Sequence, residues 1–318
     1  MRVRLLFSIA ALAVSAAVVE PAGATFPGAN GPILFREVDL DTGDAAPLFR
    51  ALPDGSQVTR LSKRPGFMSD WRADGGRIAF DFFDRKGNVQ IATMTPGGDD
   101  LQVLTSGSGI HEAPSWSPDG RHIVFDASKG DPNDPDFHTR LWIMRADGSH
   151  ARRLRMRSHK FEVEPRYSPD GTRIAFQRIR LEDDEFFQAV FVLDIRTGKA
   201  VKVTAWHLAS EHPTWSPDGR WILYNNSPDG TIQVVRPTGL DRRTIAPATP
   251  GFGGHKPWFS PDGKRIVFMC ENQGTLKDPP PDYNEDICVM NADGSNIVHV
   301  INTPGTIENY PSWGPAAP

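Results

Sequence analysis

The sequence predicts an all-β fold, a six-bladed β-propeller of four-stranded antiparallel blades. Two observations predict it. A unit of the type Trp-Ser-Pro-Asp-Gly, followed by an alternating apolar run, recurs along the 318 residues. Repeats of ~40–45 residues or slightly more that contain only strand patterns are typical of propeller blades, and no helical periodicity competes with them here.

Six copies of the unit are present, each marked by one aromatic residue. The marker residues lie 44 to 54 residues apart: Trp71, Trp116, Tyr167, Trp215, Phe259 and Trp313. The first copy is degenerate and the last is truncated after its aromatic residue.

Each copy begins as a strand, a tight turn and a second strand. In Trp215-Ser-Pro-Asp-Gly219, proline sets φ for the first turn position, aspartate bonds nearby backbone and glycine accepts a positive φ. In the run that follows, Ile222 and Tyr224 are two apart and share one face of the strand. We therefore interpret the aspartates of these turns as turn formers: Asp119, Asp170, Asp218 and Asp262.

A second apolar run with its own glycine turn follows in each unit, as in 141–148 and 287–294, and a short fourth strand comes after it. Each unit thus supplies four strands, A to D in chain order. Such a sheet cannot bury both faces alone, but radial stacking buries each face against a neighbouring sheet.

The two ends of the chain supply complementary parts of one blade. Residues 32–61 match strands B, C and D, with no strand A before them. Residues 310–313 match a strand A with nothing after it. We expect these segments to pair, so that one blade built from both ends closes the ring.

The first residues are typical of an export signal. Arg2 and Arg4 precede an apolar run from Leu5 to about Val19, and Ala22-Gly-Ala24 provides a cleavage site. We predict a signal peptide over residues 1–24 and a single propeller domain over 25–318, in the periplasm or outside the cell. A retained anchor is the alternative; no second apolar run approaches the ~20 residues of a membrane span.

Charge and cysteines restrict the partner and the redox state. The formal net charge is -4, without the basic stripe of nucleic-acid-binding domains, so no nucleic-acid partner is expected. Cys270 and Cys288 fall on strands B and C of the last complete blade, and export permits a disulfide between them. Two buried thiols are the alternative.

Polar residues gather in the connections between strand D and the next strand A. Because strand direction alternates, these connections and the B–C loops share one face of the ring, which we call the funnel face. The candidate binding residues are His111, Glu112, Glu162, Glu164, Glu211, His212, His255, Lys256 and Glu308. We expect them to converge on a polar funnel that binds a cation, a basic peptide segment or a glycan. The alternative is that they only hydrate the channel mouth and bond neighbouring backbone groups.

Three long B–C loops lie on the same face: 129–136, 181–185 and 271–286. The first is rich in aspartate, but around Asp131 it lacks the glycine and final glutamate of an EF-hand. No cofactor is expected, and a divalent cation is left open because only folding can show whether ligands from different blades converge.

Motifs for catalysis are absent from the sequence. It contains no Gly-x-Ser-x-Gly elbow, no phosphate-binding loop, no His-Glu-x-x-His and no Cys-x-x-Cys. The sequence therefore favours a binding protein over an enzyme.

The repeat resembles a known one. Pro-x-Trp-Ser-Pro-Asp-Gly-Lys/Arg-x-Ile-x-Phe, with a later Ile-x-x-Met-x-Ala-Asp-Gly, is similar to the WD40-like (PD40) repeat of TolB-type propellers, from about Pro32 to Trp313. The resemblance implies a six-bladed propeller in the bacterial envelope that acts as a protein-interaction scaffold, as in the Tol-Pal system. TolB itself carries an N-terminal α/β domain, whereas here blade strands begin soon after the predicted cleavage site. We therefore expect a TolB-like propeller that is not TolB itself.

The sequence thus predicts an exported scaffold that binds a protein or peptide of the cell envelope at its funnel face, with no chemistry of its own. Its oligomeric state is not fixed by the sequence, and we expect a monomer. The same repeat also occurs in carbohydrate-active enzymes and in propellers joined to peptidases. The rival function is a glycan-cleaving hydrolase or lyase that uses the carboxylates and histidines of the funnel, with or without a divalent cation.

Overall fold

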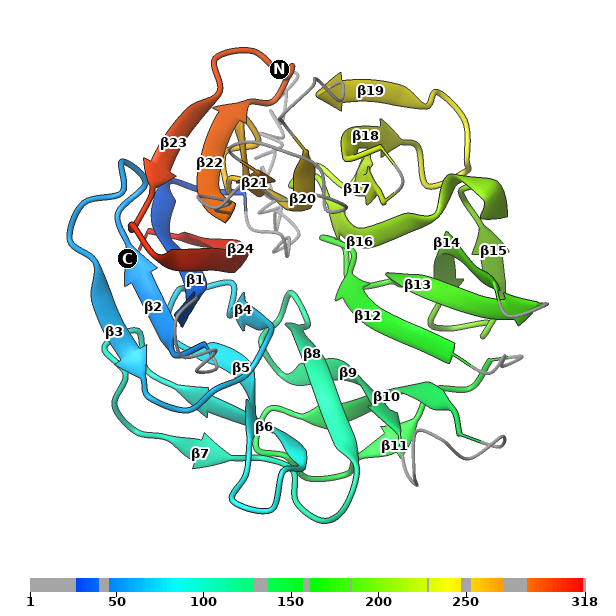
Figure 1. Cartoon of the computed structure of the whole chain (residues 1–318). Helices are drawn as coiled ribbons and strands as arrows, with labels where there is room; N and C mark the ends of the chain where they lie inside the picture. The colour runs from blue at the N-terminus through cyan, green and yellow to red at the C-terminus, as the bar shows by residue number, and fades with distance from the viewer. Residues whose placement is uncertain are drawn as a thin grey trace, which may run out of the picture.

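The fold is made of antiparallel strands arranged around a common centre (Figure 1). The computed structural model describes residues 27–39, 46–128, 137–156, 161–182, 185–227, 229–246, 253–271 and 285–316. Within these residues the only helical element is a short 3-10 helix, η1 (Trp206–Leu208). The signal peptide predicted over 1–24 lies outside them, as do the loops 129–136 and 272–284.

One sheet joins the two ends of the described chain. Its strands, in spatial order, are β24 (Thr306–Pro315), β1 (Asn30–Asp39), β2 (Leu48–Ala51) and β3 (Thr59–Ser62). Ile33 lies opposite Trp313 in this sheet. The buried Trp313 indole donates a hydrogen bond from Nε1 to the carbonyl of Gly31 at 2.9 Å. The first and last strands are therefore held by both ladder and side-chain bonds.

Three groups of antiparallel strands follow along the chain. They are β4 (Ser69–Trp71), β5 (Ile78–Phe83), β6 (Val89–Met94) and β7 (Gln102–Val103); β8 (Ile110–Trp116), β9 (His122–Ser128), β10 (Thr139–Arg145) and β11 (Arg152–Arg153); and β12 (Phe161–Tyr167), β13 (Arg173–Glu182), β14 (Glu185–Asp194) and β15 (Ala200–Lys202). Parallel bridges between Val89 and Ile110, and between Thr139 and Phe161, join them into one sheet. The sequence pattern did not predict these bridges, because each involves one residue pair.

Two further four-stranded sheets complete the described chain. They are β16 (Ser210–Trp215), β17 (Ile222–Asn226), β18 (Thr231–Val235) and β19 (Arg243–Ala246); and β20 (Gly254–Phe259), β21 (Arg265–Glu271), β22 (Glu285–Asn291) and β23 (Val298–Ile301). In Figure 1 the strands nearest the centre are β4, β8, β12, β16, β20 and β24. Each of these six strands contains the aromatic marker of its repeat.

The repeated turns have the hydrogen bonds that their residue types predict. The Ser117 hydroxyl donates to Asp119 Oδ1 at 2.6 Å, and the same oxygen accepts the amide of Arg121 at 3.0 Å. Gly120 has φ of 64°. The interpretation as turn formers is confirmed, because the same serine–aspartate contact occurs at Asp170, Asp218 and Asp262.

The core lies between neighbouring sheets. Trp215 and Ile222 pack with Ala175, Val190 and Val192 of the preceding group, and all five are buried. Because each sheet buries apolar residues against the next, its stability depends on both neighbours.

Removal of residues 311–318 tests the sheet formed by both chain ends. The deletion exposes apolar surface now covered by Trp313, and loss of a buried tryptophan alone costs about 3–5 kcal/mol. We expect the deletion to lower the midpoint of thermal unfolding, followed by circular dichroism, by well over 5 °C. A chain shortened only by Ala317 and Pro318 keeps all of β24 and serves as the control. Equal midpoints for the two shortened chains would contradict the pairing of β24 with β1.

Candidate functional site

The innermost strands share an unusual backbone feature three residues before the aromatic marker. At this position φ is positive in five strands, with values of 50° to 54°, in Ala113, Glu164, His212, Lys256 and Tyr310. Each coincides with a shift of register, which marks a β-bulge. Positive φ is uncommon in residues other than glycine, and such strain clusters at functional sites. Met68 occupies the equivalent position before Trp71, and we call these six residues the channel ring.

Buried polar side chains of neighbouring four-stranded groups bind the bulges. The acceptor is the residue that directly follows the aromatic residue in the second strand of a group. It binds the backbone amide at the bulge of the next group along the chain. Three such bonds are present, from Ala113 to Asp81 (3.2 Å), from Glu164 to Asp126 (2.8 Å) and from Lys256 to Asn225 (3.3 Å). These three acceptors are fully buried. The bulges are therefore held by contacts between neighbouring groups of strands and not by local sequence alone.

Five members of the channel ring line a cavity of about 30 Å³, together with Arg166. A volume of this size holds on the order of two water molecules. The Arg166 guanidinium donates to the carbonyl of Ala113 at 3.3 Å and lies 5.2 Å from the ring centre of Trp258. The Arg166 side chain therefore reaches from β12 to residues of β8 and β20 beside the channel ring.

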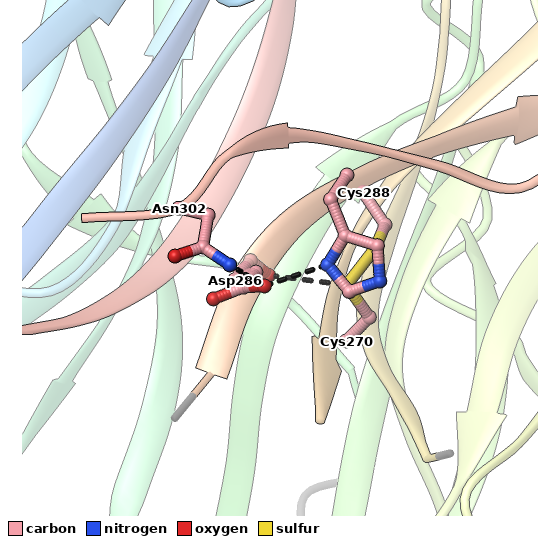
Figure 2. Close-up of a disulfide and its surroundings, with 5 residues drawn as sticks. Cys270, Asp286, Cys288 and Asn302 are labelled. Atoms are coloured by element: carbon pink, nitrogen blue, oxygen red, sulfur yellow. Dashed lines mark hydrogen bonds and ion pairs between the residues drawn. A yellow bond between two sulfur atoms is a disulfide. The ribbon is translucent and has the colours of Figure 1, made fainter. Parts of the chain in front are cut away.

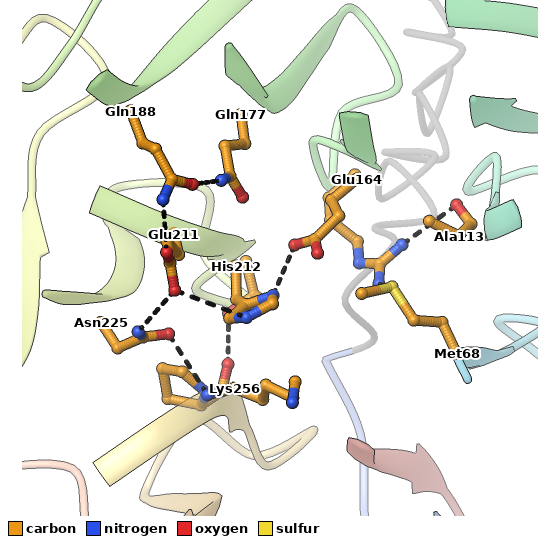
Figure 3. Close-up of polar contacts among 12 residues, drawn as sticks. Met68, Ala113, Glu164, Gln177, Gln188, Glu211, His212, Asn225 and Lys256 are labelled. Atoms are coloured by element: carbon orange, nitrogen blue, oxygen red, sulfur yellow. Dashed lines mark hydrogen bonds and ion pairs between the residues drawn. The ribbon is translucent and has the colours of Figure 1, made fainter. Parts of the chain in front are cut away.

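A histidine and a glutamate of the channel ring are hydrogen-bonded (Figure 3). His212 Nδ1 lies 2.6 Å from Glu164 Oε2, and His212 Nε2 lies 3.8 Å from Glu211 Oε2. Burial favours a higher pKa for Glu164, but His212, with nearby Arg166 and Lys256, brings this pKa below its usual range. Glu164 is therefore a carboxylate at neutral pH and orients the imidazole between two acids.

Lys256 adds a cation to the channel ring. Its Nζ lies 3.9 Å from the ring centre of Tyr310. Burial lowers the pKa of Lys256, while Glu285, Glu164 and Glu211 oppose that shift. Burial and neighbouring carboxylates raise the pKa of Tyr310, so its hydroxyl stays protonated. The cavity is therefore lined by the Lys256 ammonium group, the Glu164–His212 pair and the Tyr310 ring, all on residues with positive φ.

Two further carboxyl groups lie beside this cavity. Glu112 and Asp126 are opposite each other on β8 and β9. Burial, with Asp81 and Glu164, raises the pKa of Glu112 to about 8, and burial with Glu112 also raises the pKa of Asp126. At neutral pH this pair therefore retains a proton.

The expected convergence of all nine candidate residues on one mouth is wrong for Glu162 and Glu308. Both side chains are fully buried. Glu162 pairs with Arg178 at 2.9 Å, and Glu308 accepts the Thr303 amide at 2.9 Å. The physical reason is the bulge, which changes which residues of the strand face the centre.

The remaining candidates are divided between two places. His111 lines a separate pocket between β8, β9 and β10 that also contains His138 and Trp142. His255 precedes Lys256 and pairs with Met269 of the neighbouring strand. The structure therefore brings together Glu164, Glu211, His212 and Lys256, with Glu112 close to them.

Sequence reasoning missed half of the channel ring and its supports. Met68, Ala113 and Tyr310 were not singled out because none has the charge that drew attention to the others. Their signal is position, since each lies three residues before an aromatic marker. Asp81 and Asp126 also share one position, directly after the aromatic residue of the second strand.

The two cysteines form a disulfide between β21 and β22 (Figure 2). Their Cα atoms are 5.8 Å apart. They are not directly opposite, because Cys270 faces Asp286 and Cys288 faces Phe268. The bond is therefore diagonal across the ladder.

Curled antiparallel sheets around a centre, with a serine–aspartate turn in four of the six repeats, define a β-propeller protein. Residues 53–317 match the TolB beta propeller domain, PD40, and the chain belongs to this family. In agreement with the fold, TolB from Acinetobacter baumannii has a TM-score of 0.71 at 23% identity, over 90% of this chain and 67% of that one.

Relatives by sequence include Uncharacterized protein Atu1656 of Agrobacterium fabrum, 25% identical over 81% of this chain and 93% of its own length. Tol-Pal system protein TolB of Francisella tularensis subsp. mediasiatica is 24% identical over 81% of this chain. The alignment spans 56% of that TolB. Among the residues that the structure describes, none belongs to a helix with the length and apolar character that a membrane crossing requires.

The raised pKa of Glu112 predicts a stability that depends on pH. The folded protein holds this proton up to a pKa of about 8, against an ordinary value of 4.5. The contribution is therefore fully present below pH 4.5 and is lost as pH rises through 8. We expect the free energy of unfolding in urea to fall over this window, and to fall by at least ~1 kcal/mol less in Glu112→Gln.

The exposed Glu185 provides the control for this measurement. Glu185→Gln should keep the wild-type dependence on pH. An identical dependence in Glu112→Gln and the wild type would show that Glu112 does not hold the proton.

Proposed function

We propose that the protein is an exported six-bladed propeller that recognises a protein or peptide at its funnel face, without catalysis. The channel ring carries this proposal, because six equivalent positions of the repeat present different polar and apolar side chains, five of them on a backbone with positive φ. A scaffold needs the same backbone in every blade, whereas recognition needs different side chains there.

The strand pairings support six blades and their closure. Every group contains four strands in the order expected for strands A to D, and β24 with β1, β2 and β3 supplies the sixth group. A closed ring also accounts for the full burial of Trp313 and Ile33 at the junction of the two chain ends.

The relatives support a protein partner in the cell envelope. TolB carries the name of the Tol-Pal system, and the match covers the propeller part of this chain. The chain spans about half of that TolB, so a Tol-Pal partner is not carried over as a whole. What is carried over is the use of a propeller as a binding surface.

Export rests on the first 24 residues. Two arginines, an apolar run and Ala22-Gly-Ala24 have the order of a cleavable signal. The cysteine pair fits an oxidising compartment. N-terminal sequencing of the exported protein should therefore begin at Thr25.

A glycan-cleaving enzyme is the second candidate, because His212 is held by Glu164 beside Lys256 and Tyr310. This group contains the residue types of a general base and a general acid. A cavity of about 30 Å³ is much smaller than the several hundred Å³ of ordinary ligand pockets. Binding at the funnel surface therefore fits the geometry better than enclosure of a sugar.

Paired lysine substitutions test the proposed face. Lys256 belongs to the channel ring within β20, and the exposed Lys264 follows the turn after that strand. We expect Lys256→Met to weaken binding of the envelope partner at least tenfold, because it removes the ring's ammonium group. Lys264→Met, the same change on the turn face, should leave binding unchanged.

The measurement is photo-crosslinking in envelope extract from a probe at position 212, followed by affinity measurement with the captured protein. Equal affinities for the two lysine variants would place the binding surface elsewhere. Turnover of a glycan that is lost in His212→Ala would instead establish the second candidate.

A further inference from the structure

A cluster of metal-binding residue types, none of them a member of the channel ring, lies on one face of the sheet β20–β23 (Figure 2). Cys270 is opposite Asp286, and Cys288 is opposite His299. Asp286 and Cys288 are two residues apart on β22, so all four side chains share a face. Three adjacent strands, β21, β22 and β23, thus contribute two sulfurs, an imidazole and a carboxylate.

The distances in this cluster are short. One ligand atom from each of Cys270, Cys288 and His299 lies within 4.8 Å of the others. His299 Nδ1 is 2.6 Å from Asp286 Oδ2 and 3.9 Å from Cys270 Sγ. Bond lengths of ~2.0–2.3 Å from zinc to nitrogen and sulfur require ligand atoms about 3.5–4 Å apart. Once the disulfide is broken and the two sulfurs separate to this spacing, the cluster can approach a tetrahedral site.

Asp286 has features that the disulfide alone does not explain. Its carboxylate is fully buried, and its Oδ1 has no hydrogen-bond partner among the residues that the structure describes. Its Oδ2 receives the Asn302 amide at 2.9 Å as well as the imidazole contact. Because Asp286 accepts from His299 Nδ1, the ring's Nε2 is the nitrogen left to bind a metal, and a carboxylate that orients a histidine in this way is found around zinc ligands. The unpartnered oxygen offers a further ligand.

The burial pattern also fits a metal site with one entrance. Both cysteines are fully buried, whereas the His299 side chain is 43% exposed. An ion can thus reach the sulfurs from the side of the imidazole. In the disulfide form the sulfurs are not thiolates, and zinc requires thiolates.

We propose that Cys270, Cys288, His299 and Asp286 form a redox-gated zinc site, a disulfide when oxidised and a zinc centre when reduced. Reduction takes two electrons and two protons from a dithiol, which becomes a disulfide while the two cysteines become thiols. Zinc then replaces the two thiol protons, which pass to solvent. This site is independent of the partner proposed for the funnel face.

The test compares oxidised and phosphine-reduced forms of the full chain, titrated without oxygen with Zn²⁺ and with Co²⁺ as a spectroscopic probe. The oxidised form should bind no metal at this site. The reduced form should bind one ion per chain, with a sulfur-to-cobalt charge-transfer band, and zinc should raise its unfolding temperature. Failure of the reduced form to take up metal overturns the proposal, as does unfolding on reduction that zinc does not reverse.

Variants then separate a built site from thiols that bind metal alone. Each is first checked for folding in its oxidised form. We expect Asp286→Asn to weaken zinc binding about 10–100-fold, and His299→Ala to weaken it at least as much. The exposed His150 lies in the turn between β10 and β11, and His150→Ala should bind like the wild type. Unchanged affinity in both His299→Ala and Asp286→Asn would show that the two thiols bind metal without a built site.

Discussion

The structure depends on the hydrogen bonds made by the backbone amides at the bulges of the innermost strands. These amides turn away from their own strand ladder and must find acceptors elsewhere inside the protein. Asp81, Asp126 and Asn225 supply those acceptors from the preceding group of strands. An amide buried without an acceptor costs about 1–3 kcal/mol, so each contact couples the conformation of one sheet to the next. The same contacts hold residues such as Glu164 at positive φ, where their side chains face the cavity.

Because these hydrogen bonds involve the backbone, the side chains of the channel ring can differ between repeats while the scaffold stays the same. The serine–aspartate turns and the aromatic markers are nearly identical from repeat to repeat, and they form the scaffold. The channel ring uses one backbone position with six different side chains, from Met68 to Lys256. Burial, with nearby carboxylates, raises the pKa of the adjacent Glu112, whereas His212 and nearby cations outweigh burial and lower the pKa of Glu164 within the ring.

Most of the fold could be predicted from the sequence because the repeat is strong at every level. The turn residues, the alternation after them and the complementary chain ends predicted the strands and the pairing of Ile33 with Trp313. The site was less accessible. A bulge inserts a residue without a turn motif, so alternation alone could not show that Glu164 lines the cavity while Glu162 is buried beside Arg178. Nor could it show that the disulfide is accompanied by His299 and Asp286.

The most direct measurement of the central claim is native-state hydrogen exchange at the bulge amides in the wild type and in Asp126→Ala. The account predicts slow exchange at Glu164 in the wild type, because its amide is bound by a buried carboxylate. In the variant, exchange at Glu164 should become at least tenfold faster, while exchange at Ala113, bound by Asp81, keeps its rate. Unchanged exchange at Glu164 in the variant would contradict the account.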